Sequence, residues 1–219
     1  MASSSTDPAP HAPGRECPIC PRLAAFRAAN RAAQPGWFNA PVPAFGPLDA
    51  RLLVVGLAPG LKGANRTGRP FTGDYAGDLL YPTLIKFGFA RGDYGQRIDD
   101  GLQMIGCRIS NAVRCVPPEN RPTPAEINAC RSFLVAELAA MPKLAAVLAL
   151  GTVAHGSVLA ALKQRRAAFP FAHGARHRLG TGLLLADSYH CSRYNTNTGR
   201  LTTEMFEAVF AAIREALPA

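Results

Sequence analysis

The chain has 219 residues, of which 48% are apolar, and it carries a formal net charge of +9 at pH 7. This length and composition suit one globular domain with a sizeable core, and no apolar stretch is long enough to span a membrane. A charge this basic favours an anionic partner, with nucleic acid ahead of a membrane surface because no basic amphipathic helix stands out.

Residues 1–16 are rich in Ser, Pro and Ala, and they lack the basic start and apolar core of a secretory signal. We expect them to form a disordered lead, followed by a single domain over residues 17–219. Without an export signal, a disulfide framework is disfavoured, and the cysteines are better candidates for metal binding or burial.

Apolar runs alternate with helical patterns along the rest of the chain. We expect helices at 21–33, 78–87, 122–140, 153–162 and 201–217, and strands at 51–56, 107–113, 145–150 and 183–186, with a short further strand in 163–178. Strands that alternate with helices are typical of a mainly parallel sheet covered on both faces. The sequence therefore predicts an α/β fold, a three-layer α/β/α sandwich around a central four-stranded sheet.

The block GLAPGLKGANRTGRPFTGD, residues 56–74, directly follows an apolar strand. It lacks the spacing of the common phosphate-binding loops, so an ordinary nucleotide site is disfavoured, while a flexible surface loop is the simpler alternative. Polar loops also follow the next strand, at 111–122, and the last one, at 188–200. Because the carboxyl ends of parallel strands share one rim, we expect Asp74, Asn111 and His190 to converge there.

The chain contains six cysteines: Cys17, Cys20, Cys107, Cys115, Cys130 and Cys191. A C-x-x-C pair at 17 and 20 plus single cysteines at 115 and 130 can supply four thiolates, which suit zinc or an iron-sulfur cluster. Spacing leaves both open, although the absence of a second C-x-x-C knuckle slightly favours the cluster. Cys107 and Cys191 are predicted to be small buried apolar residues.

Three motifs resemble the uracil-DNA glycosylase superfamily, and specifically its family 5, the bacterial and archaeal type called UDGb. They are the block at 56–74, SNAVRCVPPENRPTPAE at 110–126 and HCSRYNTNTGRLT at 190–202, and the resemblance covers almost all of the chain beyond Glu16. The related family 4 has Glu at the position of Leu57, so Leu57 favours family 5 and leaves Asp74 as the polar group. Cys191 departs from the superfamily, which usually has Pro after the His.

The resemblance implies an enzyme that flips out and hydrolytically excises uracil, and also hypoxanthine and other deaminated bases, from double-stranded DNA. An abasic site is left, as the first step of base excision repair. Asp74 would either activate water or stabilise the sugar cation, and the sequence does not separate these roles. The implied catalytic residues are Asp74, Asn111 and His190; the implied substrate-binding residues are Gly56, Leu57, Ala58, Phe71, Ser192 and Asn195.

The family's iron-sulfur branches hold a [4Fe-4S] cluster on the cysteines that match Cys17, Cys20, Cys115 and Cys130. The resemblance further implies a monofunctional enzyme without strand cleavage, acting as a monomer in a bacterial or archaeal cytoplasm, in association with the nucleoid. The main alternative is a non-catalytic iron-sulfur DNA-binding protein. Such a protein would not need the three polar residues at the strand ends.

Overall fold

The computed structural model describes residues 12–217 and has a five-stranded sheet at its centre, in the order β4-β1-β5-β7-β6. Its strands are β1 (Leu52–Gly56), β4 (Cys107–Asn111), β5 (Ala146–Leu150), β6 (Arg176–Arg178) and β7 (Leu184–Ser188). The first four strands in this order pair in parallel, whereas β6 pairs antiparallel with β7. The predicted α/β class is confirmed. The short further strand expected within 163–178 is β6, and it joins the central sheet, which therefore has five strands rather than four. The polar sequence of β6 lacks the apolar pattern that marks a buried strand, and β6 pairs along one edge only.

Five helices lie close to their predicted positions: α1 (Pro21–Ala33), α3 (Tyr75–Lys86), α4 (Pro124–Ala139), α5 (Thr152–Ala161) and α7 (Thr203–Ala216). Two short helices, α2 (Ala64–Thr67) and α6 (Arg193–Asn197), were not predicted. Short 3-10 turns, η1 (Pro118–Asn120) and η2 (Arg166–Ala168), and a small hairpin of β2 (Ala90–Arg91) and β3 (Gln103–Met104) complete the structure. The predicted cap of α4 is present as a capping box, in which Thr123 and Glu126 each bond the other's backbone N–H.

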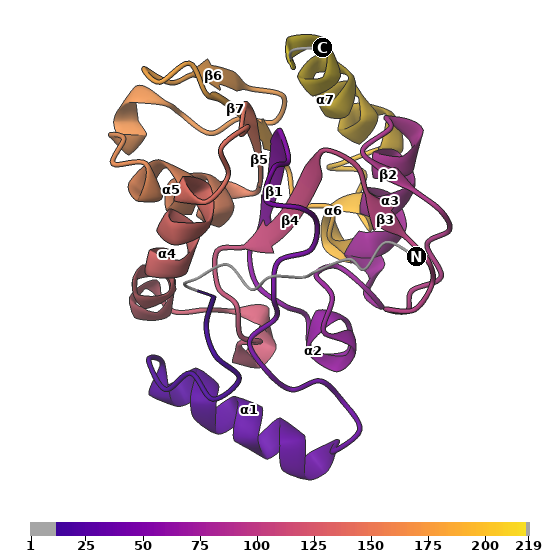
Figure 1. Cartoon of the computed structure of the whole chain (residues 1–219), viewed down its shortest axis with the longest axis vertical. Coiled ribbons are helices and arrows are strands. Elements are labelled where there is room, and N and C mark those ends of the chain that lie inside the picture. The colour runs from indigo at the N-terminus through magenta and orange to yellow at the C-terminus, as the bar shows by residue number, and fades with distance from the viewer. Residues whose placement is uncertain (1–11, 218–219) are drawn as a thin grey trace.

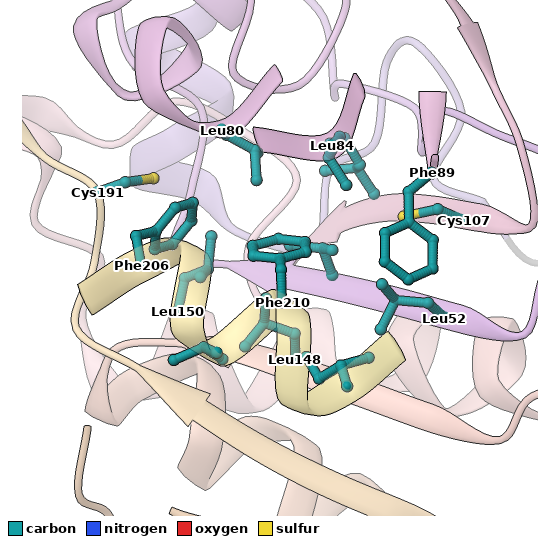
Figure 2. Packing of buried hydrophobic residues seen from close by; sticks show 14 of the residues in the cluster. Leu52, Leu80, Leu84, Phe89, Cys107, Leu148, Leu150, Cys191, Phe206 and Phe210 are labelled. Atoms are coloured by element: carbon teal, nitrogen blue, oxygen red, sulfur yellow. The ribbon is translucent and has the colours of Figure 1, made fainter. Parts of the chain in front are cut away.

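Helices cover both faces of the sheet, which gives the three predicted layers (Figure 1). Successive residues of β1 point to opposite faces, as a pleated strand requires, so Leu52 and Leu53 belong to different cores. On the Leu52 face, α3 and α7 contribute leucines and the buried Phe206 and Phe210 (Figure 2). On the Leu53 face, α4 and α5 supply aliphatic side chains. This packing fixes the strands whose ends carry the site.

The two cysteines predicted to be buried, Cys107 and Cys191, are fully buried in the core beneath α3 and α7 (Figure 2). Residues 1–11 of the expected disordered lead lie outside the described residues. The end of that lead is held against α1, because Arg31 donates to Glu16 Oε2 at 2.7 Å and to the Arg15 carbonyl oxygen at 3.1 Å. Within residues 12–217, no helix has the length and apolarity needed to cross a bilayer.

Candidate active site

A pocket of 510 Å³ opens at the carboxyl ends of the four parallel strands. Its wall includes Asp74, Asn111 and His190, which reach it from the loop after β1, the end of β4 and the segment after β7. The structure therefore brings together the three residues that the sequence predicted to converge. Leu57, Ala58, Phe71 and Ser192, predicted to bind substrate, also line this pocket.

The floor of the pocket depends on a glycine at the end of β1. Gly56 pairs with Asn111 in the parallel register of β1 and β4. A Cβ atom on Gly56 would lie 2.4 Å from Phe71 Cζ and 2.5 Å from Asn111 Oδ1, closer than atoms can approach. Gly56 is not among the residues that line the pocket. It makes room for Phe71 and Asn111, which do.

The loop after β1 is tied to the segment after β4 by the backbone. The Ala112 N–H donates to the Gly56 carbonyl oxygen at 2.9 Å, and the Val113 N–H donates to the Leu57 carbonyl oxygen at 3.0 Å. These bonds hold the backbone of Leu57 and Ala58 in place at the pocket wall. Phe71 lies with its ring centroid 6.0 Å from that of His190 and is inclined by 27° to it. A flat ring in this position can stack on a planar ligand.

Asp74 occupies the position just before α3, with extended backbone. Its carboxylate packs on two glycines: a Cβ on Gly60 or Gly63 would lie 3.0 or 2.3 Å from Asp74 Oδ2. The other oxygen, Oδ1, is buried and has no hydrogen-bond partner in the described part of the chain. Burial raises the pKa of Asp74, and the neighbouring amides of Ala76 and Gly77 act in the opposite direction.

His190 follows β7, and its Nδ1 atom is buried without a hydrogen-bond partner among the described residues. Burial lowers the pKa of His190 to about 4, so its imidazole is neutral at neutral pH. Asn195 does not line the pocket, but its Nδ2 donates to the His190 carbonyl oxygen at 2.8 Å and so fixes the loop. Cys191, in place of the usual Pro, anchors the same loop by burying its side chain in the core.

Residues 43–214 match the family described as the Uracil DNA glycosylase superfamily. The chain belongs to this superfamily. It is 47% identical over 196 residues to the Type-5 uracil-DNA glycosylase of Thermus thermophilus, covering 87% of this chain and 89% of that protein. The Type-5 uracil-DNA glycosylase of Pyrobaculum aerophilum is 42% identical over 197 residues, which are 88% of this chain and 85% of the relative.

A Type-4 uracil-DNA glycosylase of Pyrobaculum aerophilum aligns over a shorter stretch, 35% identical across 57% of this chain. The predicted resemblance to family 5 is thereby confirmed, in agreement with Leu57 where family 4 has Glu. The polar residues at the strand ends carry buried atoms without a hydrogen-bond partner in the described part of the chain, and these residues line the pocket.

The pocket also contains Tyr75, Asn120 and Thr152, which the sequence did not single out, and Arg193 and Tyr194, which belong to the third motif. Asn120 lies within the second motif, at the end of η1, with a left-handed backbone at φ 55. Tyr194 is 70% exposed, and the Arg193 guanidinium lies 5.2 Å from the centroid of the Tyr75 ring. For Asn120, position within the second motif was the available signal, whereas Tyr75 and Thr152 lie outside the three motifs.

The four cysteines predicted to bind metal line one small cavity between α1, α4 and the segment after β4. All six cysteines, which lie within the described residues, are free. Cys115 Sγ accepts a hydrogen bond from Arg27 Nη1 at 3.4 Å, and Cys130 Sγ accepts one from the Arg114 N–H at 3.4 Å. Burial raises the pKa of Cys115 and raises that of Cys130 to about 11. Thiolates at this depth need a bound cation, so the donor set fits a metal centre.

Proposed function

We propose that the pocket is the site at which this protein binds uracil and cuts it from DNA. The comparisons place the chain among uracil-DNA glycosylases, so the protein is a DNA repair enzyme that hydrolyses the N-glycosidic bond of uracil. One observation carries the assignment of the pocket. Asp74 Oδ1, Asn111 Oδ1 and His190 Nδ1 are buried at its wall, and none has a partner in the described structure.

The recessed pocket requires that the damaged nucleotide leave the base stack, at a cost of a few kcal/mol. Phe71 then stacks on the extruded base, since its ring lies in the wall with the backbone of Leu57 and Ala58. The Asn111 side chain offers one carbonyl oxygen and one amide nitrogen, which match the N3–H and the O4 of uracil. Asn111 is 3% exposed and sits in regular strand, so this recognition group is held rigidly.

His190 stabilises the leaving base. Because its pKa is lowered to about 4, the imidazole is neutral and can donate an N–H hydrogen bond without carrying charge. The uracil oxygen that gains negative charge as the bond breaks is the acceptor. Asn195 bonds the backbone carbonyl of His190, which fixes the position from which the imidazole side chain extends.

Asp74 supplies the negative charge on the sugar side. As a carboxylate it either orients and deprotonates the attacking water or stabilises the cationic sugar. Within the described residues no lysine lines the pocket, which supports hydrolysis without an amine nucleophile and hence without strand cleavage. The test is single-turnover excision on a uracil-containing duplex. We expect product strands only after alkali treatment, and breaks without alkali would contradict the proposed mechanism.

We further propose that the natural target is double-stranded DNA and that hypoxanthine and other deaminated bases are also excised. A volume of 510 Å³ has room for a bicyclic purine. The exposed Tyr194 and the cation of Arg193 stand at the rim, where a duplex would lie, and the net charge of +9 favours phosphate contacts. Excision rates on matched duplexes carrying uracil or hypoxanthine, and on single strands, test both points.

We propose that the enzyme acts as a monomer on chromosomal DNA in a bacterial or archaeal cytoplasm, and that Cys17, Cys20, Cys115 and Cys130 hold a [4Fe-4S] cluster. The convergence of four free cysteines, two with N–H donors on their sulfurs, supports the cluster. When bound, the cluster supplies a covalent cross-link between the start of α1, the segment after β4, and α4. A non-catalytic iron-sulfur DNA-binding protein is not supported, since it leaves the pocket unexplained.

Visible absorption and metal analysis test the cluster. Protein purified without oxygen should absorb broadly near ~400 nm and contain iron rather than zinc. Cys130→Ser should remove that absorption, whereas Cys107→Ser, a matched change at a buried cysteine far from the cavity, should keep it. A colourless protein with one equivalent of zinc would show that the four thiolates bind zinc instead.

A further inference from the structure

The segment from Phe71 to Asp74 carries two of the proposed site residues, and its backbone is strained. Phe71 has φ 55, in the left-handed region that residues with a side chain rarely adopt. Such a conformation costs about 1 kcal/mol or more and persists only where surrounding contacts enforce it. The contacts that hold this segment therefore determine where Phe71 and Asp74 stand in the pocket.

One hydroxyl group bonds to both peptide groups that flank Thr72. Tyr94 Oη donates to the Phe71 carbonyl oxygen at 3.0 Å and accepts from the Gly73 N–H at 3.3 Å. Gly77, in the first turn of α3, leaves the space for this arrangement. A Cβ atom there would lie 1.9 Å from the Phe71 oxygen and 2.2 Å from Tyr94 Oη.

Tyr94 comes from outside the site. It belongs to the loop between β2 and β3, the hairpin that lies beside α3 (Figure 1). It is not among the residues that line the pocket. A bound base would therefore contact Phe71 but not Tyr94.

The Tyr94 side chain is itself firmly held. Its ring stacks on that of Tyr81 with 4.5 Å between centroids, and the Arg69 guanidinium lies 6.0 Å from its centroid. Arg69 forms two hydrogen bonds with the Asp100 carboxylate, at 2.8 and 2.5 Å, and the Gly95 N–H donates to Asp100 Oδ2 at 3.0 Å. These contacts hold both the ring of Tyr94 and the loop that carries it.

We infer that Tyr94 is a positioning residue for excision, whose hydroxyl fixes Phe71 and Asp74 relative to the extruded base without touching it. The inference rests on the proposed function of the pocket. Without the hydroxyl, the Phe71 carbonyl and the Gly73 N–H lose their shared partner, and the strained backbone can relax. Asp74, one residue beyond Gly73, would then leave its place beside the sugar.

The test is Tyr94→Phe, which removes one oxygen atom and keeps the stacked ring. We expect the single-turnover rate of uracil excision to fall about tenfold, because small displacements of reacting groups are costly. Affinity for an uncleavable uracil-analogue duplex should stay within about twofold, since base and phosphate contacts are retained. Thr83→Val is the control, because it also removes one buried hydroxyl, here within α3. That hydroxyl donates at 2.8 Å to the Leu79 carbonyl oxygen, outside the segment, so the variant should lose stability but keep its excision rate.

A double-mutant cycle separates positioning from a general loss of structure. In an Asp74→Asn background, Tyr94→Phe should lower the residual rate by less than about threefold, because the residue that it positions is already disabled. Equal losses in both backgrounds, an unchanged rate in Tyr94→Phe alone, or an equal loss in Thr83→Val would overturn the inference. Failure of the proposed function is distinguishable, because the unmodified protein would then not excise uracil.

Discussion

Ser110 and Asn111 are consecutive residues of β4, and their side chains leave opposite faces of the sheet into two different environments. Ser110 Oγ donates to Glu137 Oε2 at 2.6 Å, and the same carboxylate is bonded by Arg108 Nε at 2.8 Å and by Arg114. Asn111 faces the pocket, where its Oδ1 has no partner among the described residues. Buried polar groups on one side of β4 are therefore paired with each other, whereas Asn111 on the other side keeps an unpaired atom at the pocket.

The two faces of β4 separate polar groups that contribute to stability from polar groups that contribute to the proposed function. A buried carboxylate with two arginines and a hydroxyl is satisfied in the folded chain itself. A carboxamide, a carboxylate and an imidazole with unpaired buried atoms raise the free energy of the folded state, and under the proposed function the substrate offsets that cost. Substitutions on the two sides should therefore have opposite signatures.

The largest expected effect is that of Asp74→Asn. Loss of the carboxylate should reduce single-turnover excision about 10³- to 10⁴-fold while duplex binding is retained. The control is Asp78→Asn, a matched change in the first turn of α3, where the exposed carboxylate accepts a hydrogen bond from Gln96 and excision should stay near normal. Since burial raises the Asp74 pKa and the carboxylate is the active form, the rate of the unmodified enzyme should fall as pH drops through that raised pKa. A normal rate in Asp74→Asn would remove Asp74 from the mechanism.

Next comes Glu137→Gln, on the paired side. It leaves the Arg108 and Arg114 charges buried without a counter-ion, so the free energy of unfolding should fall by about 3–5 kcal/mol. Excision per folded molecule should change little. The arginines lower the pKa of Glu137, so its contribution is present above the ordinary pKa of Glu and is lost as pH falls through the lowered value. Denaturant unfolding at pH 7 and at a series of pH values from 5 downward checks the predicted loss of stability and its pH dependence. Equal stability of variant and parent at pH 7 would contradict the predicted loss.

His190→Ala should lower excision about 10²- to 10³-fold, as expected for the loss of one donor to a developing anion. Its thermal stability should be unchanged or higher, because an unpaired buried nitrogen is removed. His177→Ala, at a histidine of β6 that does not line the pocket, serves as the comparison and should retain activity. A clearly lowered melting temperature, with excision per folded molecule unchanged, would show that His190 contributes to stability instead.

The mildest change that we predict compares the two neighbouring residues of β4, Ser110 and Asn111. Ser110→Ala removes one hydrogen bond to Glu137 and should lower the free energy of unfolding by about 1 kcal/mol without affecting excision. Asn111→Ala, one residue along, should weaken excision and leave stability near normal. If both variants behave alike, the two faces of β4 are not functionally distinct.

The sequence was most informative where apolar periodicity or a long motif marked the chain. The buried runs of β1, β4, β5 and β7 predicted the parallel sheet. Because the carboxyl ends of parallel strands lie at one edge of the sheet, Asp74, Asn111 and His190 were then expected to lie together. A short strand was expected in the polar segment 163–178, but without an apolar pattern it was not assigned to the central sheet, which was expected to have four strands. The regular spacing of strands also predicts nothing about the loop that carries Tyr94, whose hydroxyl meets the Phe71 segment only after the hairpin has folded onto α3.

Other roles depend on geometry that spacing cannot give. Gly56 and Asn195 were predicted to bind substrate, yet neither lines the pocket. Gly56 admits Phe71 and Asn111 by having no side chain, and Asn195 bonds the His190 backbone. Asn120 was missed because its place in the pocket follows from two successive left-handed residues, Glu119 and Asn120, which no periodic pattern marks.

The strand order β4-β1-β5-β7 has a consequence for a chain emerging during synthesis. Asp74 and Asn111 are made first, but the wall that contains His190 forms only when β7 inserts beside β5, after most of the chain has been translated. The pocket is therefore complete only once all four parallel strands are in place. Under the proposed function, a partly made or locally opened molecule lacks the wall that contains His190 and does not excise bases.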